Sequence, residues 1–499
     1  MKIKTLGALK KSGYQPKSIK EELRSNLIEQ LKKKTNVFDG IIGYENTVIP
    51  DIERAILSKH NIILLGLRGQ AKTRIARQMT KLLDEYMPIV AGSEMNDDPL
   101  EPISRFARDL IAEKGDKTPI EWVHRDDRFA EKLATPDVSV ADLIGDVDPI
   151  KAANMRLNYS DERVIHLGII PRSHRSIFVI NELPDLQPRI QVSLFNILQE
   201  GDIQIRGFKV RMPLDIQFVF TANPEDYTNR GSIVTPLKDR IESQILTHYA
   251  KDVETSMLIT EQEARMSPEL EKTIGMNFLA KKMVDQLAFE ARKSEFVDEN
   301  SGVSARLTIS AMENLISAAE RRMLLAGDSK THVRVGDFWG VIPAITGKIE
   351  LVYEGEQEGP FIVAQNLIGQ TIKSLFEDYF PNPELIKKQK KGKNPYQFLL
   401  DWFGQGKQFD IMVDYTNNQY EKLLMSIPGL HDLVKELHPK ADKGMRLFLM
   451  EFLLHGLSEH SLLSKGLIQS GFQFKDLFNS MLNFGGATDE GAGEQWGFE

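Results

Sequence analysis

A glycine-containing loop between a strand and a helix constrains this chain more than any other feature. An apolar run at residues 61–65 predicts a buried strand, and it leads into a loop at residues 66–73. A helical pattern over residues 73–86 follows. Backbone N–H groups of such a loop, together with the N-terminus of the next helix, surround and attract a phosphate group. We therefore predict that the loop binds phosphate and that an α/β domain is built around it.

Two side chains of the loop have expected chemical roles in binding a nucleotide. Lys72 would reach the β- and γ-phosphates of ATP, and the Thr73 hydroxyl would ligate Mg²⁺. Ala71 stands where such loops normally have glycine, and one methyl group is the least disruptive replacement. The alternative is a chance glycine-rich turn, which the strand before and the helix after disfavour. The predicted nucleotide-binding residues are Gly66, Leu67, Arg68, Gly69, Gln70, Ala71, Lys72 and Thr73.

A second apolar strand, at residues 176–180, ends in Asn181 and Glu182. Nucleotide hydrolases need one carboxylate for the magnesium shell and another to orient and deprotonate the attacking water. Glu182 fits the second role. Asn181 stands where Asp is expected; its amide oxygen accepts a hydrogen bond from a metal-bound water, but it brings no charge, so Mg²⁺ should bind more weakly. A surface carboxylate at a strand end is the alternative for Glu182, which the phosphate loop disfavours.

Hydrophobic periodicity divides the chain into four predicted parts. Residues 1–36 form an N-terminal helical extension with a helix near 19–34, and residues 37–250 form an α/β nucleotide-binding core. Residues 251–350 form a helical lid, and residues 351–499 are mostly helical with a mobile Gly- and Glu-rich tail. Predicted strands of the parallel sheet are 61–65, 177–180 and 216–222, and predicted helices are 73–86, 189–200, 255–266, 279–293, 310–326, 361–379 and 445–455.

Composition narrows the possible chemistry. The chain has 499 residues and no cysteine, which excludes disulfides, thiolate metal sites and cysteine nucleophiles. Its net charge of −8 gives no general reason to expect nucleic-acid binding, and the basic stretch at 387–393 is expected to be a solvated loop. No run is long enough for a membrane-spanning helix, and no secretory signal is present. We expect a cytoplasmic protein.

Several further motifs occur in a characteristic order. With the phosphate loop and the acidic strand end, they make residues 37–345 resemble AAA+ ATPases of the MoxR and magnesium-chelatase I-subunit branch. The resemblance implies a P-loop NTPase core, a helical lid and a β-hairpin insert. The segments that carry it are DGIIGYE at 39–45, LIG at 143–145, DP at 148–149, HLGII at 166–170, LQEGD at 198–202 continuing into a strand–turn–strand pattern at 203–210, FTANP at 220–224, PLKDR at 236–240 and VSAR at 303–306.

The resemblance also implies roles for three more residues. Asn223 would be the sensor that hydrogen-bonds the γ-phosphate or the attacking water. Arg240 would face the nucleotide of a neighbouring subunit as an arginine finger, although Ile241 stands where Phe is usual. Arg306 would be the second sensor, on the lid. The alternatives are a surface arginine paired to Asp239 or Glu242 and, for Arg306, a residue that simply starts a helix.

The function that the resemblance favours is an ATP-driven ring motor that remodels a partner protein. Members of this branch act as homo-oligomers, here expected as a hexameric ring, often with a protein carrying a von Willebrand A domain. One alternative is the ATPase subunit of magnesium chelatase, which the roughly 150 residues beyond the lid disfavour. A sigma-54-dependent activator is disfavoured because no GAFTGA loop or helix-turn-helix is found. A nucleotide-gated scaffold with little turnover stays open because of Asn181.

Overall fold

The computed structural model describes residues 3–157, 161–204, 211–224, 233–388, 394–468 and 471–477. The chain divides into two compact units, Met1–Tyr249 and Ala250–Glu499, and each is described by itself. The turn of the predicted hairpin at 205–210, most of the basic stretch and the C-terminal tail lie outside the described residues. Among the described residues, no helix is long and apolar enough to cross a membrane.

A five-stranded parallel sheet forms the centre of the first unit, in the order β11-β1-β10-β7-β4. The three predicted strands are confirmed as β1 (Ile62–Leu65), β7 (Ser176–Asn181) and β10 (Ile216–Ala222). The two flanking strands β4 and β11 were not predicted. The strands of this unit are β1 (Ile62–Leu65), β2 (Tyr86–Val90), β3 (Ile120–His124), β4 (Phe129–Leu133), β5 (Gly145–Val147), β6 (Ile165–Leu167), β7 (Ser176–Asn181), β8 (Asp202–Gln204), β9 (Arg211–Pro213), β10 (Ile216–Ala222) and β11 (Ser243–Leu246).

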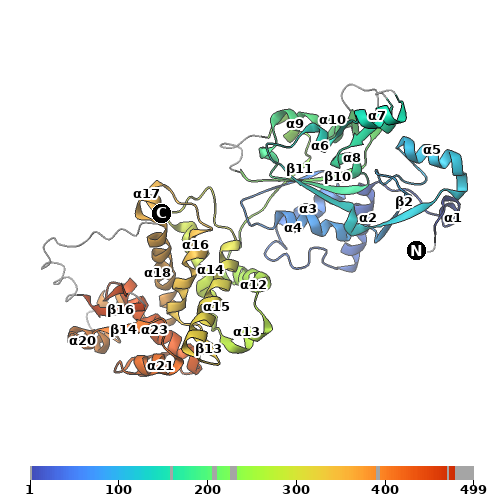
Figure 1. Cartoon of the computed structure of the whole chain (residues 1–499). Coiled ribbons are helices and arrows are strands. Elements are labelled where there is room, and N and C mark those ends of the chain that lie inside the picture. The colour runs from blue at the N-terminus through green and yellow to red at the C-terminus, as the bar shows by residue number, and fades with distance from the viewer. Residues whose placement is uncertain are drawn as a thin grey trace. The chain divides into compact units, whose positions relative to one another are not determined.

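Both faces of this sheet are buried, which explains why its central strands read as continuous apolar runs. Side chains alternate along each strand, so Ile62 and Leu64 enter one core while Ile63 and Leu65 enter the other. Figure 1 shows α2, α3 and α4 on one face and α6, α8, α9 and α10 on the other. The helices of this unit are α1 (Leu6–Lys11), α2 (Ile19–Lys33), α3 (Val48–Leu57), α4 (Lys72–Gln78), α5 (Arg105–Lys114), α6 (Val140–Leu143), α7 (Pro149–Met155), α8 (Ile169–Arg172), α9 (Pro188–Ser193), α10 (Phe195–Glu200) and α11 (Thr235–Lys238).

Two predicted helices are shorter or interrupted in the structure. The helix predicted over 73–86 ends at Gln78, continues as a short 3₁₀ turn to Leu82, and is followed by β2. The helix predicted over 189–200 is two short helices, α9 and α10, which meet at Leu194.

The N-terminal region is tied to the sheet by a buried ion pair. Glu22 of α2 accepts two hydrogen bonds from the Arg128 guanidinium, each 2.7 Å long, and both side chains are almost inaccessible to solvent. Arg128 also donates to the backbone oxygen of Arg175, just before β7. Burying two charges is costly, so each depends on the other for its compensation. The α2 helix is therefore fixed to the sheet by charge as well as by apolar packing.

The second unit is mostly helical, as predicted, and its helices share one apolar core. The core runs from Ile274 to Phe474 and joins the predicted lid helices with those of the C-terminal region. The helices are α12 (Val253–Glu263), α13 (Pro268–Thr273), α14 (Phe278–Lys293), α15 (Arg306–Ala326), α16 (Ile342–Thr346), α17 (Tyr353–Glu358), α18 (Pro360–Tyr379), α19 (Pro383–Lys388), α20 (Gln397–Gly404), α21 (Asn417–Met425), α22 (Leu430–Leu437) and α23 (Lys443–Glu459).

The second unit also contains strands that the sequence did not predict. Three of them form an antiparallel sheet in the order β14-β16-β15, and two very short ones pair in parallel. These strands are β12 (Ile274–Gly275), β13 (Thr331–His332), β14 (Phe409–Met412), β15 (Leu463–Ile468) and β16 (Gly471–Asp476).

The buried ion pair generates a test of how α2 is held. We expect Glu22→Gln to lower the free energy of unfolding of the first unit by roughly 3 kcal/mol or more, because it leaves the Arg128 charge buried without compensation. Glu21→Gln is the matched control, since Glu21 is solvent-exposed and pairs with Lys59 at the surface. It should leave stability nearly unchanged. Equal losses in the two variants, measured by urea denaturation, would contradict this account.

Candidate functional site

The register of the parallel strands places the predicted site residues at one edge of the sheet. Leu65 of β1 lies opposite Ala222 of β10, and Phe220 of β10 lies opposite Ile180 of β7. The chain therefore leaves these three neighbouring strands at the same edge, where open α/β sheets bind ligands. At this edge the phosphate loop follows β1, Asn181 is the last residue of β7, and Asn223 directly follows β10.

Gly66 opens the loop where no side chain would fit. Its N–H donates to the Ala222 carbonyl at 3.1 Å, which continues the pairing of β1 with β10. A Cβ atom at Gly66 would collide with the side chains of Thr247 and Gln70. Glycine at this position is therefore required by close packing of the loop against the end of β11.

Two further loop residues have left-handed backbone conformations. Gly69 has φ +73° and Ala71 has φ +56°. Glycine adopts such a conformation freely, but for alanine it costs about 1–2 kcal/mol. The substitution at position 71 thus has a cost that the sequence does not reveal: the strain is in the backbone, while the methyl group itself is exposed.

The loop is held by Tyr44, from the segment at 39–45, and by Thr247 and Tyr249, which the sequence did not single out. Thr247, just after β11, donates to the Gln70 side chain at 2.6 Å. The Tyr44 hydroxyl hydrogen-bonds the carbonyl oxygens of His248 (2.6 Å) and Gln70 (3.2 Å), and burial raises the pKa of this hydroxyl to about 12. The Tyr249 hydroxyl donates to the Arg68 carbonyl at 3.0 Å. These contacts fix the loop conformation from outside the loop itself.

Lys72 connects the loop to the next strand end. Its ammonium group donates to the carbonyl oxygens of Gly66 and Leu67, the latter at 3.0 Å, and to Asn223 Oδ1 at 2.9 Å. Lys72 is the first residue of α4, and Asn223 directly follows β10. The structure thus brings together a predicted phosphate-binding cation and the predicted sensor, which are far apart in the sequence.

A hydroxyl pair surrounds Asn181. Its Oδ1 atom accepts hydrogen bonds from the hydroxyls of Thr73 (3.3 Å) and Thr221 (3.2 Å). The Thr221 oxygen accepts in turn from the backbone N–H of Glu182 at 3.1 Å. The two residues predicted to hold magnesium, Thr73 and Asn181, are therefore in direct contact, and uncharged oxygen atoms of this kind suit Mg²⁺ as ligands or through water.

Glu182 occupies a strained position at the end of β7. Its φ is +57°, in the left-handed region, and its side chain is exposed. A non-glycine residue in this conformation costs energy and is found preferentially at functional sites. Glu182 directly follows the last residue of β7, Asn181, and is therefore at the sheet edge where the phosphate loop begins.

Arg240 is engaged on the surface of the first unit. Its guanidinium donates to Gln199 Oε1 at 3.1 and 2.8 Å and to the Pro236 carbonyl at 2.7 Å, and it stacks on the Phe195 ring. All of these partners of Arg240 are neutral. The alternative interpretation, an ion pair of Arg240 with Asp239 or Glu242, is therefore not observed. The proposed action of Arg240 on a neighbouring subunit stays a prediction.

Arg306 belongs to the second unit, where it is the first residue of α15 and has an exposed side chain. Its contribution to the site in the first unit stays a prediction.

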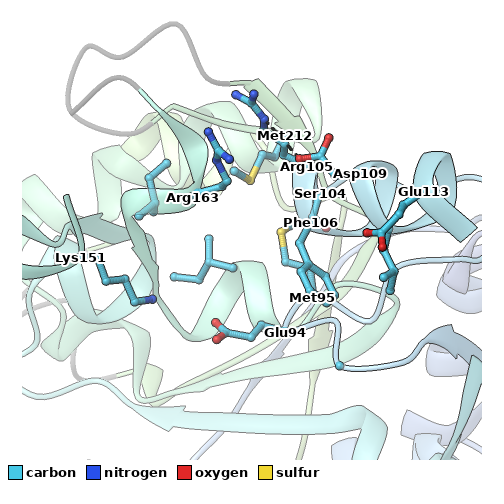
Figure 2. A pocket seen from close by; sticks show the side chains of 14 residues that line it. Glu94, Met95, Ser104, Arg105, Phe106, Asp109, Glu113, Lys151, Arg163 and Met212 are labelled. Atoms are coloured by element: carbon cyan, nitrogen blue, oxygen red, sulfur yellow. Dashed lines mark ion pairs between the residues drawn. The ribbon is translucent and has the colours of Figure 1, made fainter. Parts of the chain in front are cut away.

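A cavity of about 470 Å³ also lies in the first unit, but none of the predicted site residues lines it. Figure 2 shows Met95 and Phe106 close to each other, with Lys151 and Glu94 on another side of the cavity. Arg163 forms an ion pair with Asp161, which holds the pKa of that carboxyl well below its usual range, and Arg105 contacts the same carboxylate. Since none of the predicted site residues lines it, we assign this cavity no part in the candidate nucleotide site.

The chain has distant structural similarity to several solved structures, and no known protein-family profile matches it. NtrX from Brucella abortus in complex with ADP is 14% identical, with a TM-score of 0.33 over 59% of this chain and 53% of that chain. This chain thus spans about half the length of that structure. A putative ATPase from Cytophaga hutchinsonii is 16% identical, with a TM-score of 0.29 over 70% of this chain and 95% of that chain.

A complex between the BchI and BchD subunits of magnesium chelatase is 18% identical, with a TM-score of 0.33 over 64% of this chain and 98% of that chain. At these identities and TM-scores, function has to be argued from the geometry of the site.

The backbone strain at position 71 generates a prediction. We expect Ala71→Gly to leave the thermal stability unchanged or to raise it, because relief of about 1–2 kcal/mol of strain outweighs the entropy that glycine adds to the unfolded chain. Ala112→Gly, an exposed position inside α5, is the matched control and should lower stability by about 1 kcal/mol. Similar losses in both variants by circular dichroism would show that the left-handed conformation carries no cost.

Proposed function

We propose that this chain is an ATP-binding and ATP-hydrolysing AAA+ protein, of the MoxR and magnesium-chelatase-like branch, that acts as a homo-oligomeric ring motor on a partner protein. The observation that carries the proposal is the bridge from Lys72 to Asn223, which joins a phosphate loop to a polar residue on the neighbouring strand. The phosphate loop, Asn181 and Asn223 lie at the ends of three adjacent strands, at one edge of the sheet, which supports a common substrate for them.

Nucleotide binding follows from the loop. Gly69 and Ala71 have left-handed backbone conformations and α4 begins at Lys72, and a loop of this kind before a helix start favours anions. The Lys72 ammonium lies at the same place, held by two loop carbonyls and by Asn223. Phosphate oxygens of ATP would replace those weaker neutral partners with charge-assisted hydrogen bonds.

Hydrolysis needs a group that orients and deprotonates water near the γ-phosphate. Glu182 stands one residue beyond the Asn181 that contacts Thr73, and its exposed carboxylate is accessible to solvent. Bound Mg²⁺ would neutralise charge on the phosphates and polarise the γ-phosphoryl group. Thr73 would hold the ion directly and Asn181 through water. Because both are neutral, we expect a higher Mg²⁺ requirement than with an aspartate at position 181.

The ring and its partner complete the proposal. Arg240 would act on the nucleotide of a neighbouring subunit, where a guanidinium stabilises charge that develops on the γ-phosphoryl oxygens. To do so, the Arg240 guanidinium has to break its hydrogen bonds to Gln199. Those bonds are weaker than hydrogen bonds to a phosphate because Gln199 is neutral. Arg306 would sense the nucleotide from the lid. A hexameric ring in the cytoplasm and a partner with a von Willebrand A domain are the further elements of this proposal.

A nucleotide-gated scaffold is the second candidate, and Asn181 favours it. Its amide oxygen already accepts from two hydroxyls, and it brings no charge to the magnesium shell. Steady-state phosphate release distinguishes the two functions, since a scaffold binds ATP with little turnover. If Asn181→Asp raises turnover at low Mg²⁺ concentration, the missing charge is the reason for slow hydrolysis. An unchanged Mg²⁺ dependence would show that position 181 does not limit the reaction.

The proposed nucleotide site is tested by removing its cation. We expect Lys72→Ala to weaken binding of a fluorescent ATP analogue by about tenfold to a hundredfold, the range for losing a hydrogen bond to a charged group. Lys81→Ala is the control, because it removes an exposed cation from the 3₁₀ turn that follows α4. If both variants bind the analogue as tightly as the parent protein, the loop is not a nucleotide site.

The shared site is tested by mixing two inactive variants. Arg240→Ala and Glu182→Gln subunits should each bind ATP without turnover. Mixed rings contain interfaces that pair an intact Glu182 with an intact Arg240, so the mixture should recover part of the activity. Light scattering shows whether the mixture forms rings. If rings form but ATPase activity does not recover at any ratio of the two variants, Arg240 is not an arginine finger.

A further inference from the structure

A second, smaller cavity lies in the second unit and has a cationic lining. Its volume is about 220 Å³. Lys330, His332 and Arg334 reach it from the segment around β13, while Asn417 and Lys443 reach it from the first residues of α21 and α23. Three cationic side chains and an imidazole thus line the cavity, and one carboxylate, that of Glu421, lies among them.

Arg334 is the most informative of these residues because it is buried without a carboxylate of its own. It is 5% exposed, its guanidinium donates to the Tyr415 carbonyl (2.8 Å) and to Asn417 Oδ1 (3.2 Å), and it stacks on the Tyr420 ring. No ion pair involves its side chain within the described ranges. Burial, followed by repulsion from Arg322, lowers the pKa of Arg334 to about 10.

The two carboxylates nearest to Arg334 in the buried network are already engaged. Asp337 forms an ion pair with Arg322 at 2.9 Å and accepts the backbone N–H of Arg334. Glu451 accepts from the Tyr420 hydroxyl and from two backbone N–H groups. Since buried charges are normally paired, a guanidinium that faces a cavity with neutral partners is a place where an anion can be stabilised.

His332 is positioned in the cavity by two glycines. A Cβ atom at Gly444 would lie 2.5 Å from Cδ2 of the imidazole, and one at Gly275 would lie equally close. Only glycine at these positions lets the ring lie against the first turn of α23. The ring is therefore held next to the first turn of α23, where the Asp442 carboxylate already caps the Met445 N–H group.

The two lysines of the cavity differ in whether they form an ion pair. Lys443 forms an ion pair with Glu421 at 2.6 Å. Lys330 is exposed and, in the part of the chain that the structure describes, has no ion pair. The lining therefore keeps an excess of positive charge after its one carboxylate is counted.

We propose that this cavity binds a small phosphate-class dianion, held by the side chains of Arg334, Lys330 and Lys443. The volume of about 220 Å³ is below the roughly 300 Å³ at which pockets begin to hold drug-sized ligands. The ligand is accordingly free phosphate or a small phosphomonoester rather than a nucleotide. The site lies in the other unit from the phosphate loop, so it goes beyond the proposed function and gives the helical unit a ligand of its own.

The test is phosphate binding by the full chain with Lys72→Ala, which removes the cation of the loop in the first unit. Sodium phosphate is titrated by calorimetry at constant ionic strength maintained with sodium chloride, because exposed charges also attract anions non-specifically. We expect saturable binding, and we expect Lys330→Gln with Lys443→Gln to weaken it about tenfold or more. Lys422→Gln with Lys435→Gln is the matched control, since it makes the same charge change at exposed positions of α21 and α22 outside the cavity.

The outcomes separate the possible explanations. Equal binding by the test and control double variants, or no saturable binding in the Lys72→Ala chain, would overturn the proposal. Glycerol 3-phosphate identifies the source of the dianion: tighter binding than free phosphate assigns the cavity to a phosphomonoester, and weaker binding assigns it to phosphate itself. Circular dichroism of each variant shows that it is folded. Because binding is measured without ATP, failure of this test leaves the proposed nucleotide site unaffected.

Discussion

The alignment of β1, β7 and β10 is the constraint on which the candidate site depends. Parallel strands in this register end at the same edge, so three segments that are far apart in the sequence deliver their side chains to one place. The Lys72–Asn223 hydrogen bond is a consequence of that alignment. A register shift of one residue would reverse the face of every following side chain and separate these groups.

The alignment is secured by buried polar contacts as well as by apolar packing. Arg175, just before β7, accepts two hydrogen bonds from Arg128 at its backbone oxygen and pairs through its guanidinium with Asp98 at 2.9 Å. The Tyr14 hydroxyl contacts both partners of that second pair. Burial raises the pKa of Tyr14, so the hydroxyl stays neutral and serves as a hydrogen-bonding group. The N-terminal residues are thus part of the structure that holds the start of β7 in place.

The sequence predicts well those features that depend on local patterns. Apolar runs located β1, β7 and β10, and the spacing of glycines and Lys72 located the loop, because a buried strand followed by a helix leaves a distinctive pattern. The contacts of Thr247 and Tyr249 with the loop were not predictable, since they arise from β11 pairing with β1. The strands of the second unit were missed for a similar reason: they are short, and β14 pairs with a strand some sixty residues away.

Asn181 shows how a departure from a pattern changes meaning once its neighbours are known. From the sequence, it is a missing negative charge beside Glu182, the residue predicted to be the catalytic base. In the structure, its neutral oxygen accepts from the hydroxyls of Thr73 and Thr221, and Thr221 accepts from the N–H of Glu182. A carboxylate here would accept the same two hydrogen bonds more strongly and would add a negative charge at this edge of the sheet. The amide keeps both hydrogen bonds without that charge, and this is the reason for the higher Mg²⁺ requirement that we propose.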